Sequence, residues 1–205
     1  MKALILNSGI GKRMGALTQD KPKCMVEVQP SITVLYLQLT HLENEGIKDV
    51  VITTGPYSKL LESYARENFP DLNFTFVKDT NYIYSIALAE DVLRDDDILL
   101  MHGDLVFEPT VLRDIIKAED SSIVVDTTLP LPQKDFKAVI KDGKVAAVGI
   151  EFFDDAVAAQ PLYKLKKEDW AVWLDAIVDF CNRGDRSVYA ENALNTVTDK
   201  TNIYP

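Results

Sequence analysis

Short apolar runs alternate with segments of helical spacing over the first 130 residues. Residues 3–6, 48–54, 73–77, 97–101 and 122–125 predict strands, because they are short and rich in apolar or β-branched side chains. Residues 33–45, 58–67, 85–93 and 109–118 repeat apolar positions three or four apart and predict helices. This alternation predicts a mainly parallel sheet with helices on both faces. Ligands bind beyond the carboxyl ends of such strands, so residues 7–23 and 103–104 are expected to lie close together.

The pattern changes after about residue 130. Residues 137–140 and 144–148 predict a hairpin, with Asp142-Gly143 supplying the positive φ of a tight turn. Residues 170–182 form a clear amphipathic pattern, and residues 191–197 predict a further helix. No internal repeat or low-complexity linker interrupts the chain. We therefore predict a single domain over residues 1–205, with a nucleotide-binding part at about 1–130 and an acceptor part at about 131–205.

Composition narrows the classes of partner. The 205 residues carry a formal net charge of −10, which argues against nucleic-acid binding, since that requires a basic face. No run approaches the roughly 20 apolar residues of a membrane span, and no signal peptide is visible. Two distant cysteines, Cys24 and Cys181, predict reduced thiols. The expectation is a cytoplasmic protein whose oligomeric state, homo-oligomer included, is left open.

A glycine-rich loop follows the first strand. Gly9, Gly11 and Gly15 allow sharp turns and close approach of the backbone, and successive backbone N–H groups can then form an anion site. Arg13 adds a guanidinium that can grip phosphate oxygens. The loop fits neither a Walker loop nor the dinucleotide fingerprint. Its spacing alone supports a phosphate-binding loop and an ordinary strand-to-helix turn about equally.

The longer segment around this loop favours a phosphate-binding role over an ordinary turn. Leu6 to Thr18, followed by Lys21-Pro22-Lys23, resembles the nucleotidyltransferase signature L-x-x-G-x-G-x-R-[ML]-x-x-L-T and then P-K. The resemblance implies a Rossmann-like mixed, mainly parallel sheet, as in nucleotide-diphospho-sugar transferases. It also implies that Arg13 holds the departing phosphates and that Lys23 bridges the α-phosphate and the acceptor phosphate. The nucleotide would be bordered by Leu6, Asn7, Ser8, Gly9 and Gly11. The common form has Ala-Ala or Ala-Gly in place of Asn7-Ser8, which leaves base choice open.

Asp104 ends an apolar strand in the order His-Gly-Asp. A carboxylate there suits Mg²⁺, which binds through one or two carboxylates plus substrate phosphates, although an Asp can also cap the following turn. The resemblance favours the metal role. The family's second acid, often in a Glu-Ile-Asp motif on a late strand, has no counterpart up to Pro205, so either it lies further on or another acid serves.

The acceptor side resembles the cytidylyltransferase branch, which includes bacterial choline-phosphate cytidylyltransferases. Residues 80–86 are similar to its T-N-N-x-x-S-L segment, which implies nucleotide contacts for Thr80, Asn81 and Ser85; a helix N-cap is a compatible reading. Tyr189 and Glu191 match a Tyr-x-acid-Asn stretch, and an aromatic ring beside a carboxylate can receive an ammonium group. The predicted hairpin resembles M-K-V…D-G, which implies that Lys137 meets the acceptor phosphate. Trp170 and Trp173 could join this pocket, although their helical spacing favours the core.

The resulting expectation is a magnesium-dependent enzyme that transfers CMP from CTP to a small phosphorylated or phosphonylated alcohol or amine and releases pyrophosphate. One alternative is a sugar-1-phosphate nucleotidyltransferase that uses UTP, dTTP or GTP. Another is a nucleotide-binding domain without catalysis. An NAD-dependent oxidoreductase is disfavoured, because no acidic residue ends the second predicted strand at Thr53-Thr54-Gly55.

Overall fold

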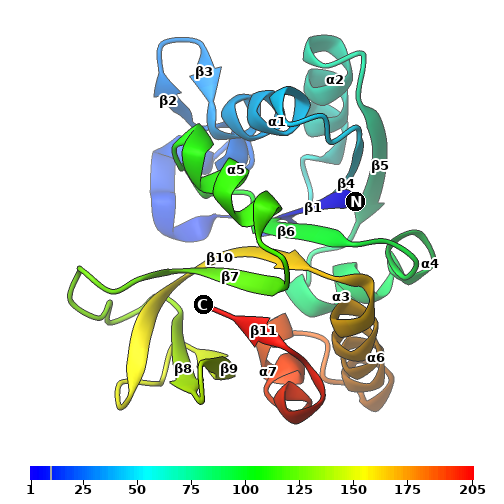
Figure 1. Ribbon diagram of the computed structural model, residues 1–205. Helices are drawn as coiled ribbons and strands as arrows, with labels where there is room; N and C mark the ends of the chain where they lie inside the picture. Colours follow the sequence, from blue (N-terminus) through cyan, green and yellow to red (C-terminus); the bar gives the residue numbers. More distant parts are fainter. Residues whose placement is uncertain (10) are drawn as a thin grey trace.

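The sheet is built outward from its first strand. The computed structural model describes residues 1–9 and 11–205, apart from the side chains at positions 12 and 13. Strand β1 (Lys2–Asn7) lies between β4 (Asp49–Thr54) and β6 (Ile98–His102), and β5 (Asn73–Lys78) continues beyond β4. All three pairings are parallel. Their carboxyl ends therefore share one edge, which confirms the predicted Rossmann-like arrangement (Figure 1).

The other half of the sheet is antiparallel around a strand that the pattern did not predict. Strand β10 (Ala156–Leu165) lies between β6 and β7 (Ser121–Asp126) and runs opposite to both. Pro161 in its middle disguises it in the sequence, because proline cannot donate a ladder hydrogen bond. The structure accommodates this proline where the register with β7 shifts between Gln160 and Tyr163. The C-terminal β11 (Ile203–Tyr204) pairs with β7 in parallel.

The predicted hairpin is present and joins this antiparallel half. Strands β8 (Lys137–Lys141) and β9 (Lys144–Gly149) pair with each other, and β8 also pairs with β10. Asp142 and Gly143 have φ values of 51° and 77°, as a tight turn of this type requires. A small separate sheet pairs β2 (Glu27–Gln29) with β3 (Ile32–Thr33).

Helices cover both faces of the sheet (Figure 1). One face carries α1 (Val34–Asn44), α2 (Ser58–Asn68) and α5 (Pro109–Lys117). The other carries α3 (Tyr82–Ala87), α4 (Glu90–Leu93), α6 (Lys167–Arg183) and α7 (Ala190–Leu194). The helix expected at 85–93 is thus two short helices, the first of which begins earlier. The 3-10 segments are η1 (Lys12–Thr18), which is kinked at Gly15, η2 (Lys23–Met25) and η3 (Thr198–Lys200).

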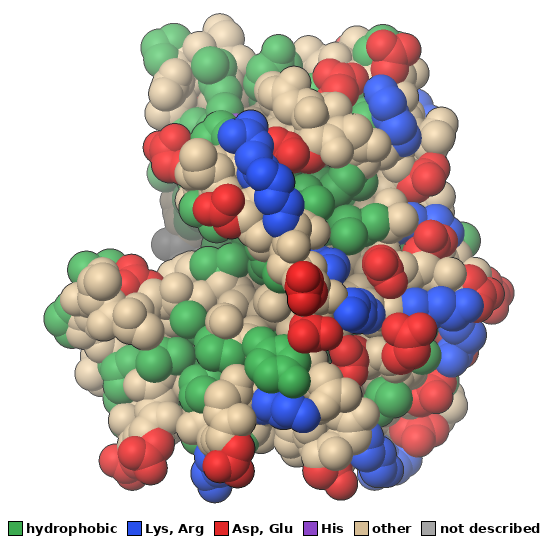
Figure 2. Space-filling view, in the orientation of Figure 1, with side chains coloured by type: hydrophobic (Ala, Val, Ile, Leu, Met, Phe, Trp, Pro, Cys, Tyr) green, Lys and Arg blue, Asp and Glu red, His purple; other side chains and the backbone are tan. Residues whose placement is uncertain are grey.

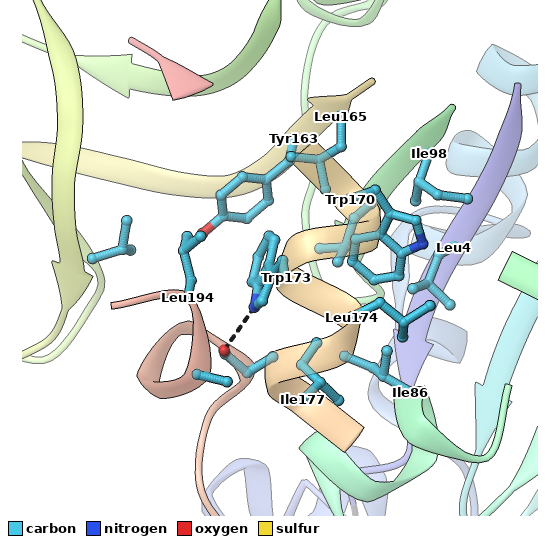
Figure 3. Close-up of a cluster of buried hydrophobic side chains, with 14 of the residues drawn as sticks. Leu4, Ile86, Ile98, Tyr163, Leu165, Trp170, Trp173, Leu174, Ile177 and Leu194 are labelled. Carbon is cyan, nitrogen blue, oxygen red and sulfur yellow. Dashed lines mark hydrogen bonds between the residues drawn. The ribbon is translucent and has the colours of Figure 1, made fainter. Parts of the chain in front are cut away.

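Helix α6 supplies the aromatic centre of one core (Figure 3). Trp170 and Trp173 are fully buried. Their indole N–H groups donate to the carbonyls of Leu93 and Ala190, at 3.0 and 2.9 Å. Both tryptophans are therefore core residues, as their helical spacing favoured, and they satisfy their polar atoms inside the protein.

The surface carries mixed charge. On the face shown in Figure 2, basic and acidic side chains are interspersed rather than gathered into one basic area. Across the described residues, no helix is both long enough and apolar enough to cross a bilayer.

Candidate nucleotide and acceptor site

The carboxyl edge of the sheet brings the predicted phosphate loop and the predicted metal acid together. Leu6 and His102 are register partners on β1 and β6, and the Gly103 N–H donates to the Leu6 carbonyl at 3.0 Å. Just beyond, Lys23 Nζ lies 3.0 Å from Asp104 Oδ2. The expected proximity of these two segments is therefore observed.

Gly11 makes room for Lys23. Its φ is +71°, and an added Cβ would lie 2.9 Å from Lys23 Cγ and 3.2 Å from Thr18. Thr18 Oγ1 also donates to the Gly11 carbonyl at 2.9 Å, which closes the loop on itself. Gly11 therefore allows the aliphatic part of the Lys23 side chain to pack closely against the loop, and the loop helps to position the Lys23 ammonium group.

Charges at this edge are arranged around Asp104. Burial alone would raise the pKa of Asp104, but the hydrogen bond and charge of Lys23 outweigh it and hold that pKa below its ordinary value. Burial lowers the pKa of the neighbouring His102 to about 4, with Asp104 raising it and Lys23 lowering it further. At neutral pH the edge therefore presents a carboxylate, an ammonium and an uncharged imidazole.

Gln38 of α1 holds the turn that carries Asp104. Its side-chain amide donates to the carbonyls of His102 and Leu105, at 2.9 Å each, on either side of Gly103 and Asp104. Gln38 is 1% exposed. A glutamine at a buried helix position was indistinguishable from a surface residue in the sequence, so sequence reasoning missed it.

A cleft of about 510 Å³ opens at this edge. Several predicted site residues line it: Leu6, Asn7, Ser8, Gly9, Lys23, Thr80, Asp104 and Tyr189. Others stand outside the lining. Ser85 is fully buried and donates to the Tyr82 carbonyl at 2.8 Å, and Asn81 occupies the N-cap position of α3. The side chain of Arg13 lies outside the described part of the chain, so its predicted role stays a prediction.

Four aromatic side chains meet at the cleft. Tyr82 contacts His102 and Tyr189 edge to face, with ring centroids 5.2 and 5.6 Å apart. Phe136 contacts His102 and Tyr189 in the same way, at 5.9 and 5.1 Å. We call these four residues the aromatic wall. Of the four, sequence reasoning had assigned only Tyr189 to the site; Tyr82 and Phe136 come from α3 and from the loop before β8, and only folding brings them together.

Glu191 lies behind this wall. It is fully buried, and the hydroxyls of Tyr82 and Tyr163 donate to its carboxyl group at 3.2 Å each. Burial raises its pKa to about 7, although hydrogen bonds to its own backbone and to both tyrosines lower it. Glu191 thus acts on the cleft through Tyr82, whose hydroxyl also lies 2.6 Å from His102 Nε2.

These two raised and lowered pKa values have opposite consequences for stability. Between about pH 4.5 and 7 the folded protein holds a proton on Glu191 that the unfolded chain releases, so this group's contribution falls as pH rises. His102 behaves oppositely: between about pH 4 and 6.5 the unfolded chain binds the proton, so its contribution rises with pH.

Lys137 has a different place from the predicted one. It is fully buried, and its ammonium group donates to the carbonyls of Pro132 and Asp135, at 2.8 and 3.0 Å. It also lies 4.2 Å from the centre of the Phe153 ring. Lys137 therefore fastens the loop before β8 rather than lining the cleft. The lysine that does line the cleft on this side is the exposed Lys134, on that same loop.

The fold and cleft define a Rossmann-like α/β protein with a lysine–aspartate pair at the carboxyl edge of its sheet. Residues 2–138 match the profile of the nucleotidyl transferase family. This match covers more than half of the chain, so the chain belongs to that family.

Individual relatives differ in nucleotide and acceptor. The chain is 30% identical over 129 residues to CMP-5'-(3-aminopropyl)phosphonate synthase of Streptomyces rubellomurinus, covering 60% of this chain and 20% of that protein. It is 30% identical over 124 residues to a UTP–glucose-1-phosphate uridylyltransferase of Haloferax volcanii, covering 58% and 49%. The chain thus spans half or less of the length of these relatives.

A solved structure of CTP:phosphocholine cytidylyltransferase from Streptococcus pneumoniae has the same fold. The two superpose with a TM-score of 0.77 at 21% identity, over 99% of this chain and 87% of that one. This likeness confirms the predicted fold class.

Proposed function

We propose that the chain is a magnesium-dependent cytidylyltransferase that transfers CMP from CTP to a small phosphorylated or phosphonylated amine and releases pyrophosphate. The observation that carries this proposal is the joining of two chemistries in one cleft. The Lys23–Asp104 pair suits a phosphate and its metal ion, and the aromatic wall backed by Glu191 suits a cationic acceptor.

The reaction needs no protein nucleophile. An oxygen of the acceptor phosphate or phosphonate attacks the α-phosphorus of CTP; the new P–O bond forms as the bond to the β-phosphate oxygen breaks, and pyrophosphate leaves with that electron pair. Lys23, whose side chain is 26% exposed at the cleft, would neutralise the oxygens of the α-phosphate and of the acceptor. Arg13 would hold the departing phosphates. Catalysis is then positioning and charge stabilisation.

The described residues fit a magnesium ion held jointly with substrate. Asp104 faces the cleft with a lowered pKa, so its carboxylate is ionised at neutral pH. Among the described residues, no cluster of three His, Cys, Asp or Glu side chains could form an all-protein metal site. Mg²⁺ commonly binds through one or two carboxylates plus substrate phosphates, which is the chemistry that Asp104 offers. The bound ion would neutralise developing charge on the phosphates.

The acceptor end of the cleft favours a cation. Tyr189 is 42% exposed and presents its ring to the cleft beside Tyr82 and Phe136. The faces of aromatic rings attract ammonium groups. Behind them, Glu191 can become a carboxylate when a positive charge arrives, because its pKa of about 7 is poised near neutrality. The exposed Lys134 would contact the acceptor's phosphate or phosphonate.

A sugar-1-phosphate nucleotidyltransferase is the second candidate. It is favoured by the match to the Haloferax volcanii uridylyltransferase, which is as similar in identity as the aminophosphonate relative. The two candidates differ in what they need from the cleft: a sugar needs groups that bond hydroxyls, such as the lining Asp135 and Gln160, whereas an ammonium group needs the faces of aromatic rings.

The direct experiment measures pyrophosphate release with Mg²⁺ and each of CTP, UTP, dTTP and GTP, crossed with phosphocholine, 2-aminoethylphosphonate and glucose-1-phosphate. We expect release with CTP and a cationic acceptor. Release only with a sugar phosphate would move the assignment to the second candidate. CTP binding that is strengthened by Mg²⁺, without release from any pair, would identify a nucleotide-binding domain instead.

Two variants separate the metal role from general damage. Asp104→Asn keeps the shape of the side chain and should abolish the gain in CTP affinity that Mg²⁺ provides. Asp71→Asn, at an exposed carboxylate outside the cleft lining, is the matched control and should retain that gain. If both variants retain it, Asp104 is not the metal ligand.

A further inference from the structure

Asn7 is the last residue of β1 and a part of the cleft wall. Its backbone N–H donates to Thr53 Oγ1 at 3.0 Å, which fixes the main chain at this point. The side chain is only 6% exposed. A carboxamide is therefore held at the cleft on a rigid strand end.

This carboxamide lacks partners within the described part of the chain. Its Nδ2 is buried with no hydrogen-bond partner, and no side-chain hydrogen bond of Asn7 is formed with the described residues. Buried amides are normally hydrogen-bonded, since leaving one unpaired costs stability. Nδ2 itself has almost no accessible surface, so a ligand in the cleft meets this N–H group only after rotation about χ2, which exchanges the two ends of the amide.

The carboxamide lies directly over the turn that carries Asp104. An added Cβ on Gly103 would fall 1.8 Å from Asn7 Oδ1 and 2.2 Å from its Cγ. The next residue is Asp104, whose carboxylate contacts Lys23. The unpaired amide therefore stands beside the paired charges to which the phosphates are assigned, where a neutral hydrogen-bond donor has an anionic oxygen to meet.

We propose that Asn7 binds the nucleotide through its side chain, donating a hydrogen bond from Nδ2 to a phosphate oxygen next to Asp104. This inference rests on the proposed function and names a contact that an alanine at this position would lack. We assign a phosphate oxygen, rather than a second cation, as the partner of the Asn7 amide. The amide N–H group would then add a hydrogen-bond donor beside Lys23 without adding charge. Ligand binding would also satisfy the buried amide that the protein itself leaves unpaired.

The test measures binding by titration calorimetry with Mg²⁺, using CTP and inorganic tripolyphosphate as probes. Asn7→Ala should weaken both by about tenfold, the loss of one hydrogen bond to a charged group. Asn7→Asp, which keeps the size but places a carboxylate at the phosphates, should weaken both further. Asn73→Ala is the control; Asn73 is exposed at the opposite end of its strand and bonds Asp49, and its loss should leave both affinities unchanged.

Each other outcome overturns the inference. If Asn7→Ala weakens CTP but not tripolyphosphate, the amide contacts the nucleoside rather than a phosphate. If Asn7→Ala raises the melting temperature and leaves both affinities intact, the amide is a packing feature only. Failure of the wild-type protein to bind any nucleoside triphosphate would instead refute the proposed function, so the two failures are distinguishable.

Discussion

Gly103→Ala tests the close contact between the two strand ends at the cleft. The backbone of Gly103 lies outside the left-handed region, so alanine is allowed there by conformation. The obstacle is Asn7, because the new Cβ would lie 1.8 Å from its Oδ1 and all three nearest atoms belong to that side chain. An ordinary contact is about 3.5 Å, so the carboxamide would have to move by about 1.5 Å or more.

The expected magnitude follows from two opposing effects. Overpacking of this kind costs about 1–3 kcal/mol, and the lower entropy of the unfolded chain returns about 0.4–1 kcal/mol. Gly103→Ala should therefore lower the free energy of unfolding by about 1–2 kcal/mol in the wild-type background. In an Asn7→Ala background the obstacle is gone, and the same substitution should be neutral or stabilise by up to about 1 kcal/mol.

Urea unfolding of the four proteins, followed by circular dichroism, gives the coupling between the two sites. We expect a coupling energy of about 2 kcal/mol, with unchanged m values. An equal loss of stability in both backgrounds would refute the reasoning, since it would show that something other than Asn7 opposes the methyl group.

Three further predictions concern the residues around the cleft. Gln38→Glu replaces both N–H donors with oxygen and should lower the free energy of unfolding by about 2–4 kcal/mol, whereas Gln38→Met should lower it less. If urea unfolding ranks the two variants the other way, the bonds from Gln38 to the turn that carries Asp104 are contradicted. Lys137→Met should lower the free energy of unfolding by about 1–3 kcal/mol. It should also raise KM for the acceptor more than KM for the nucleotide, because Lys137 fastens the loop before β8, which carries Lys134; an equal change in both KM values would argue against an effect through this loop. Glu191→Gln removes the titration of the Glu191 carboxyl group. As pH rises from 4.5 to 7, the free energy of unfolding of the variant should therefore rise by about 3 kcal/mol relative to that of the wild type. His102 titrates in both proteins and cancels in this difference; a flat difference across that range would mean that Glu191 titrates normally.

Local sequence patterns were enough to predict those strands, helices and turns that depend mainly on residues close together in the chain. The apolar runs at 3–6 and 97–101 became the paired strands β1 and β6, and Asp142-Gly143 formed the expected turn. Strand β10 escaped detection because Pro161 breaks its local pattern. Its place between β6 and β7 comes from long-range pairing, which can tolerate a proline at an irregularity of the register.

The candidate site divides in the same way. The order of residues was enough to predict that Lys23 and Asp104 would meet, because both follow strands whose carboxyl ends share an edge. The order of residues could not assign the role of Lys137, because a lysine in a strand looks the same in the sequence whether its ammonium group binds a ligand or two backbone carbonyls. Nor could it assemble the aromatic wall, whose members lie up to about a hundred residues apart in sequence.

The sequence by itself therefore determined the family, the sheet edge and the charged pair of this protein. Only the tertiary structure decided which polar groups are buried, and that in turn sets their chemistry. Glu191 has a pKa near neutrality because packing removes it from water, and Asn7 keeps an unpaired amide because no neighbour reaches it in the described structure. Solvation and hydrogen bonding belong to the assembled fold, so no local pattern of residues records them.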